Sequence, residues 1–251
     1  MNSLLNYQAT FDLLKNRVIL VTGAGQGIGR AAAMAFASRG AQVILLGRKL
    51  AKLEAAYDEI LEAGHVEPLI FPLDLIKATD QEFAAVAEGI LQQLGRLDGI
   101  LHNAAHYDVL SPLEIQTPKQ FEQMLRVHLL APFSLTKACL PLLKQSTDAS
   151  VIFTSTSSAQ TPAAYWGAHA VSKAAADHMA KVWALELENY PNLRINTVVP
   201  GPVQSPQRSK SHPGEIPTSQ PPVERLMPLY LYLMGADSRG ISGQTFSPDR
   251  C

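Results

Sequence analysis

The chain has 251 residues, with 21 basic and 22 acidic side chains and a formal net charge of -1. This length is sufficient for one α/β domain with a large core, and the balanced charge offers no basic surface for nucleic acid or an anionic membrane. The cysteines are Cys139 and Cys251, too few for a disulfide framework or a zinc site, so we expect a cytoplasmic protein without a metal site. We find neither the pattern of a signal peptide nor an apolar run long enough to span a membrane.

The first strong local signal is an apolar run that ends in a glycine-rich turn and is followed at once by a helix-forming, alanine-rich stretch. This order places unpaired helix N–H groups and the positive end of the helix dipole at the end of a buried strand, where they bind phosphate. Glycine lets the turn close and lets a pyrophosphate approach bare backbone. A plain strand–turn–helix connection is the alternative. The turn consists of Gly23, Ala24, Gly25, Gln26, Gly27, Ile28 and Gly29.

Beyond this unit, strand and helix patterns alternate along the chain. Such alternation is typical of a single α/β domain, a doubly wound parallel sheet of about seven strands with helices on both faces and right-handed crossovers. No internal repeat or linker divides the chain, so we expect one domain over residues 1–251. The predicted strands are near 17–22, 42–46, 68–72, 99–102, 150–154, 194–199 and 244–246. The predicted helices are near 27–39, 50–63, 80–94, 118–145, 166–189 and 222–235.

Residues 200–222 are rich in Pro, Ser and Gly and show no apolar period. A loop of this length is usually functional or mobile. We interpret it as a substrate lid over the carboxyl ends of the strands, where ligands bind in this architecture; a disordered surface loop is the alternative. Arg208, Lys210 and His212 in this loop hint at an anionic substrate, although a charged loop is usually just solvated.

Four short motifs follow one another along the chain: Thr22-Gly23-x-x-x-Gly27-x-Gly29, Asp74-Leu75, Asn103-Ala104-Ala105 and Pro200-Gly201. In this order and spacing they resemble the short-chain dehydrogenase/reductase family, and the likeness extends from about residue 15 to residue 247. The chain looks most like a bacterial branch with Leu-Leu-Gly-Arg after the second strand and Met-Pro-Leu-Tyr-Leu near the end, here residues 45–48 and 227–231. The resemblance implies a Rossmann-type fold that binds a nicotinamide dinucleotide.

The resemblance also implies how each motif binds this cofactor. The glycine turn would hold the pyrophosphate, Asp74 would accept from the adenine amino group, and Leu75 would contribute backbone. Asn103 and Ala104 would lie against the ribose, and Ala105 stands where the family usually has glycine. The expected cofactor-binding residues are Gly23, Gly25, Gln26, Gly27, Ile28, Gly29, Arg48, Asp74, Leu75, Asn103, Ala104, Ala105, Lys173, Pro200, Gly201 and Val203.

The residues after the second strand indicate which dinucleotide binds. An acidic residue there would bind the ribose 2′-hydroxyl and repel a 2′-phosphate, whereas this chain has Gly47, Arg48 and Lys49. Because a guanidinium matches phosphate with paired donors, we favour NADP(H) over NAD(H). The alternative is that Arg48 and Lys49 only solvate the start of the next helix.

The resemblance further implies four catalytic groups: a proton-transferring tyrosine, a lysine that lowers its pKa and holds the ribose, a serine for the substrate oxygen, and an asparagine that orders a water relay. Lys173 is present, and His169 stands at the tyrosine position, four residues before it. Thr156, beside Ser157, stands at the serine position, and His128 at the asparagine position. Imidazole is shorter than phenol, and Lys173 disfavours its charged form, so we expect impaired activity.

Other residues near these positions have alternative interpretations. Tyr165, four residues before His169, is a candidate substitute acid if the helix begins early enough; otherwise it is a loop aromatic at the pocket wall. His128 is a buried histidine bonded to backbone if it is not a relay, and His102 is most simply a core residue.

Two functions from different classes remain open. The first is an NADP(H)-dependent oxidoreductase that transfers hydride to or from a small carbonyl or alcohol substrate, with His169 as a weak proton donor. The second is a catalytically silent NADP(H)-binding protein that acts by binding or assembly. A hydrolase is disfavoured because the chain has no Gly-x-Ser-x-Gly elbow. The resemblance implies a homodimer or homotetramer joined through the helices at 118–145 and 166–189, with no nucleic-acid or membrane partner.

Overall fold

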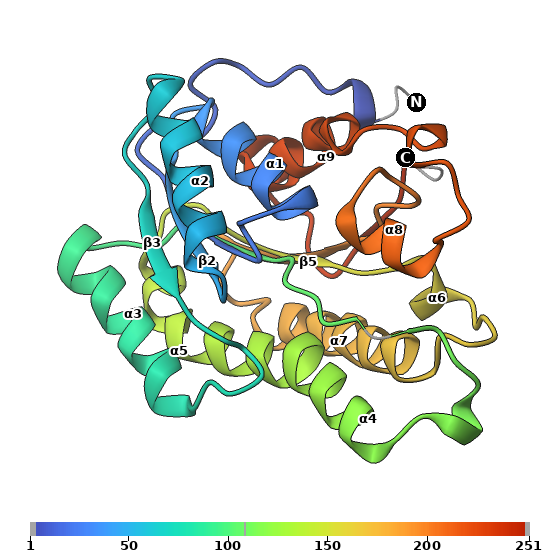
Figure 1. Cartoon of the computed structure of the whole chain (residues 1–251). Helices are drawn as coiled ribbons and strands as arrows, with labels where there is room; N and C mark the ends of the chain where they lie inside the picture. The colour runs from blue at the N-terminus through green and yellow to red at the C-terminus, as the bar shows by residue number, and fades with distance from the viewer. Residues whose placement is uncertain (1–3, 108, 249–251) are drawn as a thin grey trace.

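The computed structural model describes residues 4–107 and 109–248 (Figure 1), so Cys251 lies outside the described residues. Within this part of the chain, seven parallel strands form one sheet in the order β3-β2-β1-β4-β5-β6-β7. The predicted doubly wound α/β fold is confirmed. The strands are β1 (Val18–Thr22), β2 (Gln42–Gly47), β3 (Leu69–Pro72), β4 (Gly99–His102), β5 (Ala149–Thr154), β6 (Leu193–Val198) and β7 (Thr245–Phe246).

Helices cover both faces of the sheet (Figure 1): α1, α2 and α9 on one face, and α3, α5 and α7 on the other, with α4 beside α7. The α-helices are α1 (Gly27–Ala37), α2 (Leu50–Glu62), α3 (Asp80–Leu94), α4 (Pro118–Leu125), α5 (Ala131–Gln145), α6 (Ser157–Gln160), α7 (Gly167–Glu186), α8 (Pro206–Ser211) and α9 (Met227–Met234). The shorter helical turns are η1 (Leu4–Asn6), η2 (Leu113–Ile115), η3 (Arg126–Leu130), η4 (Pro217–Ser219), η5 (Val223–Leu226) and η6 (Ala236–Ser238).

The central strands are apolar throughout because helices bury both of their faces. In β1, Ile19 and Val21 belong to the core cluster under α1, α2 and α9, whereas Val18 and Leu20 belong to the cluster under α3, α5 and α7. A continuous apolar run is the pattern of a parallel strand that is covered on both sides. No helix in the described part of the chain combines the length and apolar character needed to cross a bilayer.

The predicted helical region over 118–145 is confirmed, and it contains one irregular turn that the sequence did not reveal. The structure has α4, then the π-helical turn η3, then α5. A π turn inserts one extra residue into a helix without breaking its apolar face, so the hydrophobic period of the sequence does not reveal it. The insertion matters because it contains His128, one of the predicted catalytic positions.

The lid segment over 200–222 contains an ordered helix, α8, which the sequence prediction missed. Ser205 is its N-cap, and the Ser205 hydroxyl accepts a hydrogen bond of 3.1 Å from the backbone N–H of Arg208. This cap is the serine signal expected at a helix start, but a helix this short has no apolar period to predict it. The segment after 222 also begins as the 3-10 turn η5, before α9.

At the amino ends of the strands, one buried carboxylate joins two arginines. Asp148, just before β5, accepts from Arg17 at 3.0 Å and also pairs with Arg194 of β6. Arg194 in turn donates to Ser238 and to the carbonyl of Gly235, at 2.8 and 2.6 Å. Burial alone would raise the pKa of the Asp148 carboxyl, but the neighbouring guanidinium groups hold that pKa below its usual value. The network therefore fastens β1, β5 and β6 at the end of the sheet away from the glycine turn.

We expect Asp148→Asn to lower the free energy of unfolding by about 3–5 kcal/mol, because Arg17 and Arg194 then stay buried without their counter-charge. Since the pKa of Asp148 is depressed in the folded state, its stabilisation is present above the unfolded-state pKa and is lost as the pH falls through the folded-state value. Urea unfolding near neutral pH and at about pH 3 measures both effects. Asp58→Asn, at an exposed position of α2, is the control. Equal unfolding free energies for the two variants near neutral pH would contradict this account.

Candidate active site

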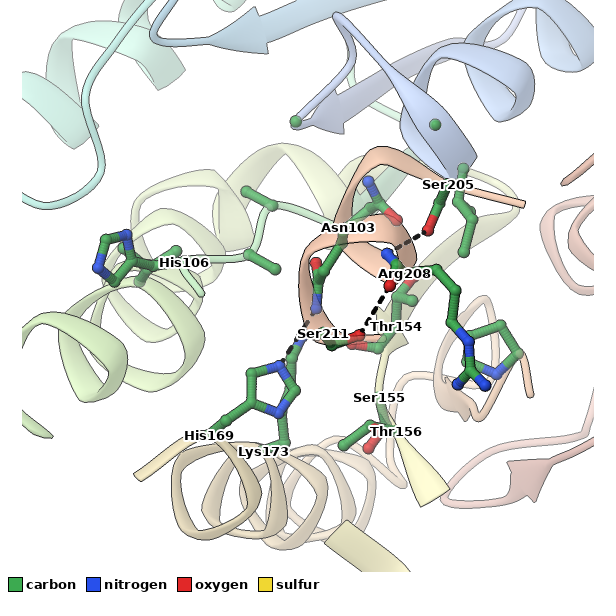
Figure 2. Close-up of a pocket in the computed structure, with 18 of the residues that line it drawn as sticks. Asn103, His106, Thr154, Ser155, Thr156, His169, Lys173, Ser205, Arg208 and Ser211 are labelled. Atoms are coloured by element: carbon green, nitrogen blue, oxygen red, sulfur yellow. Dashed lines mark hydrogen bonds between the residues drawn. The ribbon is translucent and has the colours of Figure 1, made fainter. Parts of the chain in front are cut away.

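A cleft of about 1040 Å³ lies at the carboxyl ends of the strands. It spans the point between β1 and β4 where the order of strands in the sheet reverses, which is where open α/β sheets bind their ligands. The cleft brings together residues that are far apart in sequence (Figure 2). Of the predicted site residues, all line it except Gly29 and His128.

The glycine turn presents bare backbone at the start of α1. Gln26 is the N-cap and makes no side-chain cap hydrogen bond, so no side chain occupies the N–H groups of the first turn. Gly23 has φ +70°, and a Cβ there would lie 2.9 Å from the Cα of Ala104. A Cβ on Gly29 would lie 2.3 Å from the carbonyl oxygen of Gly23. Gly29 is therefore buried beneath the turn and lets the two sides of the turn meet, and its contact with a pyrophosphate stays a prediction.

Thr22, at the end of β1, holds the glycine turn against the next wall of the cleft. Its hydroxyl accepts hydrogen bonds from the backbone N–H groups of Asn103 and Ala104, at 3.0 and 3.1 Å, and donates to the carbonyl of Leu101 at 3.3 Å. Sequence reasoning included Thr22 in a motif but assigned it no role. Because strands β1 and β4 are neighbours, a hydroxyl at the end of one reaches the backbone of the other.

The far end of the cleft is basic. Arg48 and Lys49 follow β2 and are exposed there. Lys52, in the first turn of α2, also lines the cleft and donates to the side-chain oxygen of Gln26, a residue that sequence reasoning did not find. Asp74, at the same end, accepts the backbone N–H of Ile76 at 3.1 Å, so one oxygen of its carboxylate fixes the local turn.

Helix α8 closes the cleft from the side opposite α7 (Figure 2). Pro200, Gly201 and Val203 lead from β6 to this helix. A Cβ on Gly27 would lie 3.6 Å from the Cδ of Pro206 and 3.8 Å from the Cβ of Ser205. The segment predicted as a lid therefore lies against the glycine turn.

The cationic residues of this lid are partly compensated. Arg208 donates twice to the carboxylate of Glu215, at 2.6 and 2.8 Å. Its guanidinium lowers the pKa of Glu215 to about 2. The Ser211 hydroxyl lies 2.8 Å from Nδ1 of His212, and Lys210 lines the cleft without an ion pair in the described residues. The hint of an anionic substrate is thereby weakened, because a fixed carboxylate neutralises Arg208.

His169 and Lys173 project from α7 into the cleft (Figure 2). The Lys173 ammonium donates to the carbonyl of Thr154 at 2.6 Å, and burial lowers its pKa to about 8. Burial and the charge of Lys173 lower the pKa of His169 to about 3. The imidazole is therefore neutral at physiological pH, and its Nε2 lies 3.4 Å from the amide nitrogen of Gln207 in α8.

Hydroxyl groups face these two side chains from the end of β5. Thr156 and Ser157 line the cleft, and the Thr156 hydroxyl lies 3.4 Å from that of Ser158. Asp177, one helical turn after Lys173, accepts from Ser155 at 2.6 Å. Sequence reasoning missed Asp177. Its signal is the four-residue spacing from Lys173 on one helix face.

His128 is buried behind the cleft. Its Nε2 accepts the backbone N–H of His106 at 3.0 Å, so the ring proton is on Nδ1, which lies 2.8 Å from the Ser172 hydroxyl. This hydroxyl in turn donates to the carbonyl of His169 at 3.0 Å. Both ring nitrogens of His128 thus make hydrogen bonds within the protein. This fits the alternative given above, a buried histidine that is bonded to backbone. His102 is a core residue as well, with Nε2 2.8 Å from the Thr136 hydroxyl.

Tyr165 fits the second interpretation given above, a loop aromatic, because the condition for a substitute acid is not met. Helix α7 begins only at Gly167, and Tyr165 lies before it with φ +72° and 58% of its surface exposed. It does not line the cleft, so the four-residue spacing from His169 does not place it on the same helical face.

The arrangement of the cleft is that of a dinucleotide-binding protein. An uncapped helix start beside close-packed glycines, at the switch point of a doubly wound sheet, fits the pyrophosphate of a dinucleotide. Within the described residues, no group of three or more His, Cys, Asp or Glu side chains is arranged to hold a metal ion.

The family model described as short chain dehydrogenase matches residues 17–215. The protein called uncharacterized oxidoreductase YciK, of Escherichia coli (strain K12), is 42% identical over 242 residues, covering 96% of this chain and 95% of the relative. This chain therefore belongs to the short-chain dehydrogenase/reductase family of oxidoreductases, whose members use a nicotinamide cofactor.

Solved structures agree with this assignment. A short chain dehydrogenase from Pseudomonas syringae matches with a TM-score of 0.92 and 45% identity, over 97% of this chain and 99% of that one. A short chain dehydrogenase from Shigella flexneri 2a str. 301, complexed with NADP, matches with a TM-score of 0.92 and 41% identity, over 96% of this chain and 100% of that one.

We expect Thr22→Val to weaken dinucleotide binding about tenfold, because the backbone of Asn103 and Ala104 loses the hydroxyl that positions it. Leaving two half-buried N–H groups without this acceptor should also lower the free energy of unfolding by about 1 kcal/mol. Fluorescence titration measures the affinity, and urea unfolding measures the stability. Ser150→Ala is the control, because it removes a buried hydroxyl, bonded to the carbonyl of Leu233 at 2.7 Å, at the other end of the sheet. An unchanged affinity in Thr22→Val would contradict this role.

Proposed function

We propose that this chain is an NADP(H)-dependent oxidoreductase that transfers a hydride to or from a small carbonyl or alcohol substrate, with His169 at the proton-transfer position. The observation that carries the proposal is that His169 and Lys173 face the same cleft as the glycine turn. Binding residues for a dinucleotide and ionisable groups for proton transfer therefore border one space.

Two observations support NADP(H) as the dinucleotide. Arg48 lies exposed at the end of β2 and lines the cleft, where a guanidinium can bind a 2′-phosphate with paired donors. The similar protein from Shigella flexneri is complexed with NADP. The residues proposed to bind the rest of the cofactor line the same cleft and are Gly23, Gly25, Gln26, Gly27, Ile28, Asp74, Leu75, Asn103, Ala104, Ala105, Pro200, Gly201 and Val203.

The side chains divide the chemistry among them. Lys173 brings a buried positive charge to the ribose, and the hydroxyl of Thr156 or Ser157 holds the substrate oxygen. His169 exchanges a proton with that oxygen through Nε2. When bound, the cofactor supplies or accepts the hydride. Because the pKa of His169 is about 3, a neutral ring must serve as the proton donor or acceptor, and we propose that turnover is slower than with a tyrosine.

The second candidate is a silent NADP(H)-binding protein, and the neutral, deeply buried state of His169 favours it. Either protein would be a homodimer or homotetramer. Exposed apolar side chains support this assembly, since large apolar patches mark interfaces. They lie on η3, α5 and α7 and are Leu130, Phe133, Val171, Val182 and Leu185. The cytoplasmic location stays a prediction from the low cysteine content.

Turnover separates the two candidates. We expect the unmodified protein to oxidise NADPH slowly over a panel of aldehydes and ketones, and His169→Tyr to be faster by about 10²-fold, since a correctly placed proton donor contributes about 10²–10⁴-fold. NADPH fluorescence in the same samples controls for binding. Binding without any turnover by the unmodified protein would contradict the enzyme proposal and favour the silent protein.

We expect Arg48→Ala to weaken NADPH binding by about 10–100-fold, because charge-assisted hydrogen bonds contribute about 1.5–3 kcal/mol, and to leave NADH binding unchanged. Titration of both dinucleotides measures the ratio of affinities. Arg225→Ala removes an exposed guanidinium outside the cleft and serves as the control. An equal loss of affinity for both dinucleotides in Arg48→Ala would show that Arg48 does not select the 2′-phosphate.

A further inference from the structure

The imidazole of His169 has two faces with different surroundings. Nε2 faces the cleft, where it lies 3.4 Å from the amide nitrogen of Gln207. That nitrogen can only donate, so Nε2 accepts and the ring proton is on Nδ1. Nδ1 is buried, and it has no hydrogen-bond partner among the described residues. The resting tautomer therefore presents a basic nitrogen to the substrate and an unpartnered N–H donor to the protein interior.

Behind His169 lies a second, much smaller cavity, with about 10 Å³ of space for the centre of a water molecule. That is close to the space that one water needs. Tyr107 and His169 both line it, with ring centroids 5.7 Å apart in an edge-on arrangement. Its other lining residues are Val109, Leu110, Gln116, Gln120, Met124, Tyr165 and Trp166.

The hydroxyl of Tyr107 is the second unpartnered group of this cavity. No described residue completes a hydrogen bond with this buried oxygen. Burial raises the pKa of Tyr107 to about 12. The nearby backbone N–H of Leu110 lowers this pKa slightly, but it does not form a full hydrogen bond with the hydroxyl. Gln116 bonds Ala168 and Ser111, at 3.0 and 2.8 Å, and makes no hydrogen bond to this hydroxyl. His169 and Tyr107, which carry these two unpartnered groups, thus border a space of about one water, and a water that bridges the two groups would satisfy both.

We propose that one water in this cavity joins Nδ1 of His169 to the hydroxyl of Tyr107, and that this link holds the ring proton on Nδ1, so that Nε2 faces the substrate as a base. The inference rests on the proposed oxidoreductase function. It assigns Tyr107 as a positioning residue that acts through His169, in place of the exposed Tyr165.

The link determines what the imidazole can do in the reaction. In alcohol oxidation, Nε2 would take the hydroxyl proton of the substrate as hydride leaves the carbinol carbon for the oxidised dinucleotide. The ring is then an imidazolium, and its Nδ1–H donates to the water that Tyr107 holds. In carbonyl reduction, the Nε2 proton of this imidazolium would pass to the substrate oxygen.

Few charged groups among the described residues surround this ring. Lys173 faces His169 from one turn further along α7, and its charge disfavours an imidazolium. The rings of His128, Trp166 and Tyr107 pack around His169, with centroids 5.1, 5.3 and 5.7 Å from its own. No carboxylate is among these contacts, so a hydrogen bond from Nδ1–H to the proposed water is the stabilisation that they leave for a positive ring.

The first test uses the protein without cofactor. Long-range proton–nitrogen NMR correlation identifies the tautomer of each histidine ring, and loss of one signal in His169→Asn assigns His169. We expect the His169 proton on Nδ1, and a shifted Nδ1 resonance in Tyr107→Phe, which removes one oxygen and keeps the ring contacts. Tyr165→Phe, the matched control at the same cavity, should give the spectrum of the unmodified protein. An unchanged Nδ1 resonance in Tyr107→Phe, or a proton on Nε2, would overturn the link.

The second test measures alcohol oxidation. Tyr107→Phe should lower kcat by about tenfold or more, because a base that is no longer held in place is misplaced, and leave the KM for NADP unchanged. In a His169→Tyr background the same change should have no effect, because a phenol has no second nitrogen to bind the water. Equal kcat values for Tyr107→Phe and the unmodified protein would overturn the positioning role of Tyr107. If no variant turns over while the Nδ1 shift is present, the oxidoreductase proposal fails and the hydrogen-bonded link stands.

Discussion

The structure depends on the contact between two backbone segments at the carboxyl ends of β1 and β4. There is no room for a Cβ at Gly29. It would lie 2.3 Å from the carbonyl oxygen of Gly23 and 2.6 Å from the side-chain nitrogen of Asn103. The hydroxyl of Thr22 then fastens the two segments with a pair of hydrogen bonds. This contact keeps the first turn of α1 open to the cleft, so the phosphate-binding geometry is a consequence of how the sheet closes at its switch point.

The two ends of the cleft differ in how far they follow the family pattern. The glycine turn, Asp74 and Asn103 are in place around a large space. At the proposed proton-transfer position, by contrast, the buried imidazole of His169 stands where the family has a phenol, and burial and Lys173 keep it neutral. The proposed dinucleotide site thus follows the family pattern, whereas the proposed acid–base group does not. The proposed water between Nδ1 and Tyr107 holds the tautomer in which this ring presents a base to the substrate.

The sequence predicted the sheet well because its physical signals are local. Continuous apolar runs marked the buried strands, and a run ending in glycines before an alanine-rich helix marked the phosphate turn. Family motifs located residues that line the cleft, from Gly23 to Val203. These signals depend on a few neighbouring residues, so they can be interpreted without knowing the packing.

Features that depend on contacts between distant segments could not be predicted in the same way. The π turn at His128 leaves the apolar period intact, and α8 is too short to have one. The ion pair between Arg208 and Glu215 forms only when the lid folds back on itself. Tyr165 had the right spacing but lies before the helix start, whereas Tyr107 reaches His169 from a different loop. Spacing along one helix says nothing about a side chain that arrives from another element.

The account holds that proton transfer, rather than hydride transfer, is the step that the change at His169 affects. The most direct measurement compares turnover in light and heavy water with turnover using NADPH deuterated at its reactive carbon. The account predicts that heavy water slows the reaction strongly and that the deuterated cofactor changes the rate little. A large effect of the deuterated cofactor, with none from heavy water, would show that the imidazole already transfers its proton rapidly and would contradict the account.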